Sequence, residues 1–188
     1  MANVTYKEIS DLVLEELHTS LGVIKEEEVE QLIDIVLGAR KVFFIGVGRV
    51  MLSLEAMAKR LAHLGIQTHV VGDINEPAFG VDDLLVVASG SGESIVPVAI
   101  AKKAKSIGGK IVHIGSNPTG TVAQLADLQV RIPAQTKLAL ADEFQSNQAM
   151  TSLFEQTLLL YGDAVAAVII DAKGLDIHAL WDTHANLE

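Results

Sequence analysis

The stretch that decides the fold is Asp82-Asp83-Leu84-Leu85-Val86-Val87-Ala88-Ser89-Gly90-Ser91-Gly92-Glu93-Ser94. Residues 84–88 form an uninterrupted nonpolar run, which is typical of a strand buried on both faces of a parallel sheet. Residues 89–94 predict a loop, and residues 95–107 then show the nonpolar periodicity of a helix that Gly108-Gly109 ends. A strand, a glycine-rich turn and a helix in direct succession form the repeating unit of a parallel α/β sheet.

The same unit recurs on both sides of this stretch. Strands are predicted at residues 42–45, 68–71, 84–88, 111–114 and 128–132, and helices at residues 51–64, 95–107 and 122–125. Helices at 6–20 and 26–37 precede them, and a loop at 133–147, a strongly nonpolar helix at 153–170 and a short helix from 176 to about 186 follow.

This order predicts an α/β fold, a three-layer α-β-α sandwich around a five-stranded parallel sheet with right-handed crossovers. We expect a single domain at 1–188, made of an N-terminal helical extension (1–38) and an α/β core with C-terminal helices (39–188).

The composition excludes several classes of protein. The 188 residues carry a formal net charge of −10, and nucleic acid binding requires a basic surface, so no nucleic-acid partner is expected. The chain has no cysteine, which excludes disulfides, thiolate nucleophiles and thiolate metal sites. It shows no signal-peptide pattern and no nonpolar run of the roughly 20 residues that span a bilayer. We therefore expect a cytoplasmic protein without a membrane partner.

The loop at 89–94 has the chemistry of an anion site. Its glycines let the backbone approach a ligand closely, and its three serine hydroxyls add hydrogen-bond donors. The N-terminus of the following helix adds a partial positive charge, and open α/β sheets bind ligands at the carboxyl ends of their strands. A phosphate monoester fits such a site. The alternative is an ordinary turn in which Ser94 only caps the helix.

A second glycine turn, Gly46-Val47-Gly48-Arg49, follows the first strand. It matches half of a dinucleotide-binding fingerprint, with Asp73 as the ribose-binding acid, but Met51 stands where the third glycine belongs. Two glycine turns at neighbouring strand ends suit one small ligand shared between them, with Arg49 pairing with a phosphate or a sugar hydroxyl. The alternative for Arg49 is an ordinary surface cation.

Glu155 is the candidate general base. It lies near the start of the nonpolar helix at 153–170, where a carboxylate is partly desolvated, as suits proton abstraction near neutral pH. The alternative is structural, because Ser152-Leu153-Phe154-Glu155 is a capping-box pattern in which Glu155 accepts from the Ser152 N–H.

Two histidines have a distinctive place in the sequence. His63 lies at the C-terminal end of the helix at 51–64, where the helix dipole favours an imidazolium, and this interaction alone can account for it. His184 lies in the C-terminal tail, where a histidine is usually mobile and without a function. No pair of histidines has the spacing of metal ligands, so we expect no metal.

Five segments together resemble the sugar isomerase (SIS) family, and within it the 6-phospho-3-hexuloisomerases. They cover nearly the whole chain, and in chain order they are Gly46-Val47-Gly48-Arg49, Arg60-Leu61-Ala62-His63-Leu64-Gly65, residues 89–94, Ser152-Leu153-Phe154-Glu155-Gln156 and His184-Ala185-Asn186-Leu187-Glu188.

The resemblance implies an enzyme that isomerises a sugar phosphate without a metal or an organic cofactor. Glu155 would be the base that moves a proton between adjacent carbons through a cis-enediolate, converting 6-phospho-3-hexulose into fructose 6-phosphate. The substrate-binding residues would be Gly48, Arg49, Ser89, Gly90, Ser91, Gly92, Glu93 and Ser94, of which the loop at 89–94 would hold the phosphate. His184 would be a second catalytic residue, and His63 a further candidate.

The resemblance also implies a homo-oligomer, a dimer or a tetramer. Residues of neighbouring subunits lie near the pocket in this family, so His184 could act in trans.

The chain departs from the family pattern beside the pocket. Val50, Asn75-Glu76-Pro77-Ala78 and Ala149-Met150-Thr151 replace a Ser, a Thr-Pro-type stretch and a Pro-Met-Gly stretch, and Ser94 replaces a Thr. The alternatives are an isomerase of another phosphosugar, such as the arabinose 5-phosphate type, and a sugar-phosphate sensor that performs no catalysis.

Overall fold

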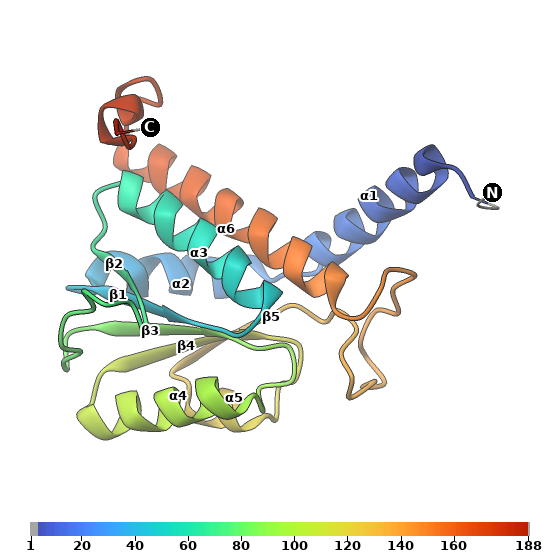
Figure 1. Cartoon of the computed structure of the whole chain (residues 1–188), viewed down its shortest axis with the longest axis horizontal. Helices are drawn as coiled ribbons and strands as arrows, with labels where there is room; N and C mark the ends of the chain where they lie inside the picture. The colour runs from blue at the N-terminus through green and yellow to red at the C-terminus, as the bar shows by residue number, and fades with distance from the viewer. Residues whose placement is uncertain (1–3, 188) are drawn as a thin grey trace.

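Five parallel strands run through the centre of the protein in its computed structural model, which describes residues 4–187 (Figure 1). The strands are β1 (Val42–Ile45), β2 (Thr68–Val70), β3 (Leu84–Ala88), β4 (Lys110–Gly115) and β5 (Leu128–Arg131). Their order in the sheet is β2-β1-β3-β4-β5. The register places Phe44 of β1 between Val70 of β2 and Val86 of β3. Because all neighbours are parallel, the carboxyl ends of the strands share one edge of the sheet.

Helices cover both faces of this sheet (Figure 1). One face carries α2 (Glu26–Gly38), α3 (Arg49–His63) and α6 (Ser152–Lys173), and the other carries α4 (Ile95–Ile107) and α5 (Thr121–Leu125). Side chains alternate between the faces, so Phe44 and Val86 join the core under α3 and α6, whereas Phe43 and Leu85 join the core under α4. The predicted three-layer α/β fold with a five-stranded parallel sheet is confirmed.

The long helices α3 and α6 pack closely against each other. A Cβ atom at Gly162 of α6 would lie 2.9 Å from Cβ of Met57, so only glycine lets the two helices approach this far. The N-terminal ends of both helices point to the edge of the sheet where the strands end (Figure 1). This packing fixes the place of the first turn of α6, which carries Glu155.

The predicted elements lie within three residues of the observed ones, with one exception. The helix expected from 176 to about 186 is wrong, because only Ala179–Thr183 are helical, as a short 3-10 helix. Gly174, with a φ of +59°, ends α6. None of the residues of the 3-10 helix is buried, so packing does not stabilise a longer helix here.

Helix α6 is longer than predicted, and this bears on the expectation that no segment is long enough to span a membrane. With 22 residues it is long and apolar enough to cross a membrane by length and composition, whereas no such segment was expected. However, 56% of its most nonpolar window is buried inside the protein, as in a helix that belongs to a protein core.

Helix α1 (Tyr6–Gly22) extends away from the sheet and its helices (Figure 1). Thr5 and Glu8 form a capping box at its start. Of the nonpolar residues predicted on one face of this helix, Leu17 is buried but Ile9 is 45% exposed. The end of the helix that lies next to α6 is therefore anchored, while much of its nonpolar surface is left uncovered by this chain. Residues 1–3 and 188 of the expected domain lie outside the described residues.

Candidate functional site

The carboxyl ends of β1 and β3 meet where the strand order reverses, since the chain continues from β1 to β2 on one side and from β3 to β4 on the other. Open α/β sheets bind ligands in the crevice at such a point. Both predicted glycine turns begin here, and a Cβ atom at Gly46 would lie 3.4 Å from the carbonyl oxygen of Ala88, the last residue of β3 before the turn at 89–94. The structure therefore brings the two turns together, as the sequence predicts.

Serine hydroxyls hold the loop at 89–94 in a tight turn. The Ser89 hydroxyl accepts a hydrogen bond from the Gly92 amide at 3.1 Å and lies 3.3 Å from the Ser94 hydroxyl. The Ser91 hydroxyl accepts from the Glu93 amide at 3.2 Å. Ser94 takes the N-cap position of α4, but its side chain makes no capping hydrogen bond. The alternative in which Ser94 only caps the helix does not describe this loop.

The loop presents backbone amides that have no internal partner. Within residues 4–187, the N–H groups of Gly90, Ser91, Ser94 and Ile95 donate no hydrogen bond. They lie in the loop and the first turn of α4, whose N-terminus carries a partial positive charge. Unbonded amides at a helix N-terminus bind anions such as phosphate.

The Glu93 carboxylate is bound at the start of α5. It accepts from the Thr121 amide at 2.6 Å and from the Thr121 hydroxyl at 2.8 Å. These hydrogen bonds, the one from the backbone first, lower the pKa of Glu93. The carboxylate thus ties the loop at 89–94 to α5.

Glu155 lies beside this loop and pairs with Arg49. Its carboxylate accepts from Arg49 Nε at 2.5 Å and from the Thr151 hydroxyl at 2.8 Å, and its backbone carbonyl accepts from the Ser53 hydroxyl at 2.8 Å. The side chain of Glu155 is only 10% exposed, whereas that of Arg49 is 67% exposed. The capping box with Ser152 does not form, because α6 starts at Ser152 with Thr151 as its N-cap residue.

The loop at 89–94 lies next to the start of α6. A Cβ atom at Gly90 would lie 3.9 Å from the ring of Phe154, the residue before Glu155. It would also lie 3.0 Å from the Thr136 methyl group, so a side chain at position 90 has little room. An anion held by the loop and a carbon chain reaching Glu155 would therefore belong to one small molecule.

The two candidate histidines lie together at the other end of α3. The rings of His63 and His184 stack with centroids 5.7 Å apart, and Trp181 packs on His184 at 5.4 Å. Burial, together with the nearby charges of Lys59 and Arg60, lowers the pKa of His63. Arg49 and His63 are the two ends of α3, which at 1.5 Å per residue separates them by about 20 Å. Within one chain the structure does not bring His63 or His184 to Glu155.

His113 of β4 supports the first residue of the loop at 89–94. Its side chain is fully buried, and Nε2 lies 3.0 Å from the Ser89 carbonyl oxygen. Because a carbonyl only accepts hydrogen bonds, Nε2 carries the proton. Burial lowers the pKa of His113 to about 4, and the hydrogen bond to Ser89 opposes this shift in part. The imidazole is thus neutral at physiological pH and holds the first residue of the loop.

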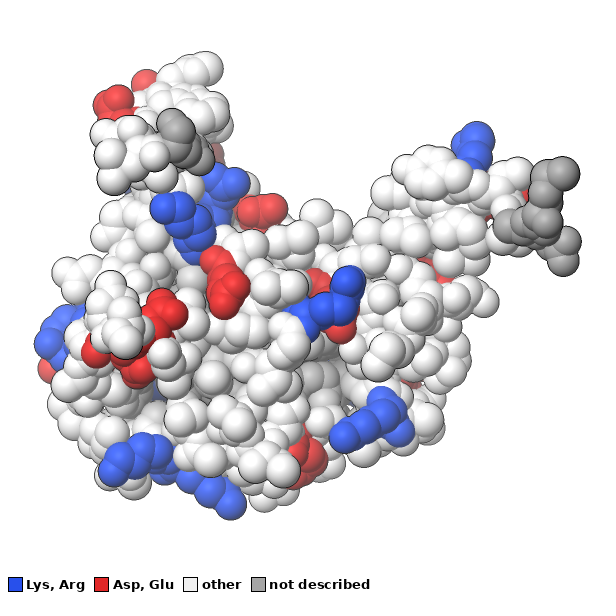
Figure 2. All heavy atoms as spheres, in the orientation of Figure 1, with Lys and Arg blue, Asp and Glu red and all other residues white. Residues whose placement is uncertain are grey.

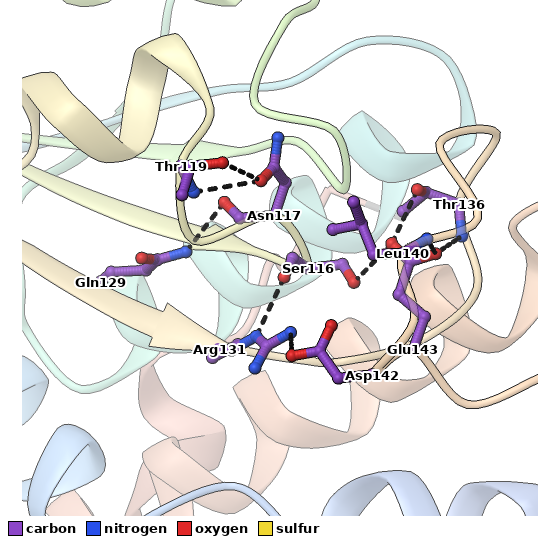
Figure 3. Close-up of polar contacts among 9 residues, drawn as sticks. All are labelled: Ser116, Asn117, Thr119, Gln129, Arg131, Thr136, Leu140, Asp142 and Glu143. Carbon is purple, nitrogen blue, oxygen red and sulfur yellow. Dashed lines mark hydrogen bonds and ion pairs between the residues drawn. The ribbon is translucent and has the colours of Figure 1, made fainter.

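A polar network on the neighbouring strand was missed by the sequence analysis. Figure 3 shows Glu143, from the loop between β5 and α6, hydrogen-bonded to Ser116 at the end of β4 and to Thr136. The residues Ser116-Asn117 follow a buried strand directly, which is the same signal that identified the other two turns. Glu143 carried no such signal, because the loop around it has no periodic pattern.

Glu16 of α1 is a second missed contact. Its carboxylate accepts from the Ser146 hydroxyl and from the Asn147 amide, both at 2.7 Å, and from the Gln148 side chain at 3.0 Å. These residues precede the start of α6. Glu16 therefore holds the segment that leads to Glu155.

The cavities of the protein lie away from the two glycine turns. Cavities of about 200 to 240 Å³ lie between α3 and β2, beside α1, and under α4, and the glycine turns line none of these. Within residues 4–187, no three His, Asp or Glu side chains gather as a metal site would require. Figure 2 shows acidic and basic side chains interspersed over one face, without a continuous basic tract on that face.

Comparison with known proteins relates this chain to one family over most of its length. The family model of the SIS domain matches residues 35–167. A 3-hexulose-6-phosphate isomerase of Bacillus subtilis (strain 168) is 40% identical to this chain over 94% of the chain and 95% of its own length. A crystal structure from Methanococcus jannaschii, from which a molecular function of 3-hexulose-6-phosphate isomerase was inferred, is 32% identical with a TM-score of 0.83, over 96% of this chain and 99% of that one. An E. coli protein solved in complex with a phosphosugar is 21% identical with a TM-score of 0.77, over 98% of this chain and 100% of that one, and shares the fold.

Proposed function

We propose that this chain, which belongs to the SIS domain family, is an isomerase that interconverts 6-phospho-3-hexulose and fructose 6-phosphate. One observation carries the proposal. The buried carboxylate of Glu155, paired with the exposed Arg49, lies beside a loop whose backbone amides are unbonded and suited to a phosphate. A carboxylate base next to an anion site suits a phosphorylated substrate with an acidic C–H bond.

The phosphate would bind to the loop at 89–94. The free amides of the loop and the N-terminus of α4 attract the anion, and the hydroxyls of Ser89 and Ser94 add donors. This leaves the carbon chain to extend towards Phe154 and Glu155, which lie in the helical turn next to Gly90.

Glu155 would carry the proton. The ketone is at C3 in 6-phospho-3-hexulose and at C2 in fructose 6-phosphate. The carboxylate takes the proton from C2, the electrons of the broken C–H bond form a cis-enediolate over C2 and C3, and the proton returns to C3. The hydroxyl proton passes from O2 to O3, so atoms and charge balance. A single base on one face of the enediolate serves both steps.

Arg49 would stabilise the enediolate. Its Nε atom holds Glu155, while its two terminal nitrogens bind no other residue within 4–187. These nitrogens can donate to the oxygens at C2 and C3 where negative charge develops. Gly48, directly before Arg49, has a φ of +59° that favours glycine, and this backbone conformation would set where α3 and Arg49 begin.

Replacing the base tests the proposal. We expect Glu155→Gln to lower kcat at least about 1000-fold while sugar-phosphate binding changes by less than about 10-fold. Solvent deuterium exchange into fructose 6-phosphate should disappear in the same variant. The matched control is Asp163→Asn, which removes the other carboxylate in the middle of α6, half-exposed and 3.6 Å from Arg60. Wild-type exchange in Glu155→Gln, or none in the wild type, would refute the proposal.

The identity of the sugar rests on the residues that depart from the family pattern. Asn75-Glu76-Pro77-Ala78 and Ala149-Met150-Thr151 flank the proposed pocket. Turnover measured with hexulose, pentose and heptose phosphates, including arabinose 5-phosphate, identifies the substrate. Binding of fructose 6-phosphate without any exchange would instead favour a sensor.

The proposed enzyme is a cytoplasmic homo-oligomer, a dimer or a tetramer, with a shared pocket. In one chain His184 lies about a helix length away from Glu155, and α1 leaves nonpolar side chains such as Ile9 uncovered. A neighbouring subunit would cover α1 and bring its own His184 to the pocket.

Subunit mixing tests the shared pocket. Glu155→Gln and His184→Ala are each expected to be nearly inactive, and after subunit exchange about a quarter of the wild-type activity should return if the pocket is shared by two subunits of a dimer. Mixed oligomers without recovered activity would rule out His184 acting in trans. Light scattering on the wild type measures the oligomeric state itself.

A further inference from the structure

Glu143 is a buried carboxylate that the proposed chemistry does not use. It is 6% exposed and accepts four hydrogen bonds, two from backbone amides and two from hydroxyls. These come from Ser116 Oγ at 2.9 Å, Thr136 Oγ1 at 2.7 Å, Thr136 N at 3.0 Å and Leu140 N at 3.1 Å (Figure 3). No Lys, Arg or His within residues 4–187 forms an ion pair with it. A buried charge held by neutral donors alone is costly, and this favours a specific role.

The two hydroxyl partners of Glu143 enclose the phosphate loop. The amides of Ser116 and Asn117 both donate to the Gly90 carbonyl oxygen, at 3.0 and 2.9 Å. On the other side, the Thr136 methyl group lies 3.0 Å from the position of a Cβ atom on Gly90. Gly90 is therefore held between two residues that one carboxylate joins.

This arrangement fixes the direction of a free amide. The peptide bond between Gly90 and Ser91 is planar and trans, so its N–H points opposite to its C=O. With the Gly90 carbonyl bound to Ser116 and Asn117, the Ser91 N–H points away from them. It is one of the amides that donate no hydrogen bond within the described chain.

We propose that Glu143 is a positioning residue for the phosphate site. By tying Ser116 to Thr136 it holds the Gly90–Ser91 peptide with its N–H towards a bound phosphate monoester. The proposal rests on the proposed function, because it takes the loop at 89–94 to be the phosphate site. Glu143 itself touches neither the substrate nor the reacting atoms.

A phosphate-specific loss of binding is the signature of this role. We expect Glu143→Ala to raise the inhibition constant of inorganic phosphate and the KM of the sugar phosphate about 10- to 100-fold, with kcat changed less than about 3-fold. Glu143→Gln retains an oxygen for the two backbone amides and an NH₂ group that can donate to the two hydroxyls. It is therefore expected to stay within about 5-fold of the wild type.

Two isosteric variants keep the test valid if Glu143→Ala does not fold. Thr136→Val keeps the methyl group against Gly90 and removes the hydroxyl, and Ser116→Ala removes the second hydroxyl. Each is expected to raise the phosphate inhibition constant about 3- to 10-fold. Asp142→Asn is the control. It weakens the exposed pair with Arg131, which also anchors the loop between β5 and α6. This variant should leave the phosphate inhibition constant within about 2-fold of the wild type.

The outcomes separate this inference from the proposed function. If Ser89→Ala and Ser94→Ala do not change phosphate inhibition, the loop is not the phosphate site and the proposed function fails with it. If those variants weaken phosphate binding but folded Glu143→Ala and Thr136→Val do not, only the positioning role is wrong. An equal effect of Asp142→Asn would mean that general loosening of the loop, and not Glu143, is responsible.

Discussion

Arg49 at the first turn of α3 donates from Nε to the carboxylate of Glu155 at the first turn of α6, over 2.5 Å. The two partners differ in freedom. Glu155 is 10% exposed and is held by Thr151 as well, whereas Arg49 is 67% exposed. The carboxylate is thus fixed by the protein, and the guanidinium is the partner that can move towards a substrate.

Substitution of Arg49 tests its two proposed contacts, one with Glu155 and one with the enediolate oxygens. Arg49→Lys keeps the charge but loses the planar array of donors, and we expect kcat/KM to fall about 10- to 100-fold. Arg49→Ala should cost about 10-fold more, because Glu155 then loses its charged partner too. Steady-state kinetics measures both. Arg60→Lys, in the loose half-exposed pair with Asp163, is the control, and an active Arg49→Ala would contradict the assignment.

Gly48 is expected to be required for its backbone conformation alone. Its φ of +59° and ψ of −139° are accessible to glycine and costly for other residues, while a Cβ atom there would meet no atom within 4 Å. Gly48→Ala should therefore lower the free energy of unfolding by about 1–3 kcal/mol and reduce activity by moving Arg49.

Gly22 provides the comparison for Gly48. A Cβ atom at Gly22 also meets no atom within 4 Å, but this residue ends helix α1 without a positive φ. Gly22→Ala should raise the free energy of unfolding by about 0.5–1 kcal/mol. Denaturant titration of both variants measures the difference, and equal effects would show that the backbone of Gly48 is not strained.

His113 makes stability depend on pH. Its pKa is about 4 in the folded state and near 6.5 when unfolded, so between these values the unfolded chain binds more protons. The folded state consequently loses stability as the pH falls, by about 2 kcal/mol between pH 7.5 and pH 5. In His113→Gln this part of the pH dependence should vanish. Denaturant titrations at the two pH values test it, with His18→Gln as an exposed control, and an unchanged pH profile would contradict it.

Glu16 links helix α1 to the proposed catalytic helix. Burial raises the pKa of Glu16, but hydrogen bonds from Asn147, Ser146 and Gln148 outweigh this and lower it overall. The stabilisation is thus complete above the ordinary pKa of Glu and is lost as the pH falls through the lowered value.

At neutral pH, Glu16→Gln should lower both the stability of the protein and its activity. The new NH₂ group would face donors of the segment at 146–148, and we expect a loss of about 1–3 kcal/mol in the free energy of unfolding together with a lower kcat. Thermal unfolding and kinetics measure the two effects. The exposed neighbour Glu15 gives the control Glu15→Gln, and wild-type kcat in Glu16→Gln would separate α1 from the site.

The sheet could be predicted because its signals are local. The run at 84–88 is nonpolar throughout and is followed at once by glycine and serine, so both the strand and the loop are encoded within 13 residues. The pairing of Arg49 with Glu155 was less accessible. Each residue was identified by its place at the start of a helix, but their contact depends on the packing of α3 against α6, with Gly162 against Met57.

The contacts of Glu16 and Glu143 could not be predicted from the sequence. Glu16 binds residues 130 to 132 positions further along the chain, and neither carboxylate lies in a pattern that indicates its partners. The prediction of a C-terminal helix from 176 to about 186 was wrong for a different reason. The segment after Gly174 contains helix-compatible residues such as Trp181, but it buries none of them, and an unburied segment of this length does not form a stable helix.

If the unbonded amides of the loop at 89–94 bind the phosphate as proposed, they set how the rate of substrate binding depends on salt. A chain with a formal net charge of −10 repels a phosphate dianion at long range, and partial charges on amides act only nearby. Added sodium chloride screens this repulsion over about 10 Å at 0.1 M. Capture of the sugar phosphate is therefore expected to become faster as ionic strength rises, the reverse of the trend for proteins that steer anions with a basic cleft.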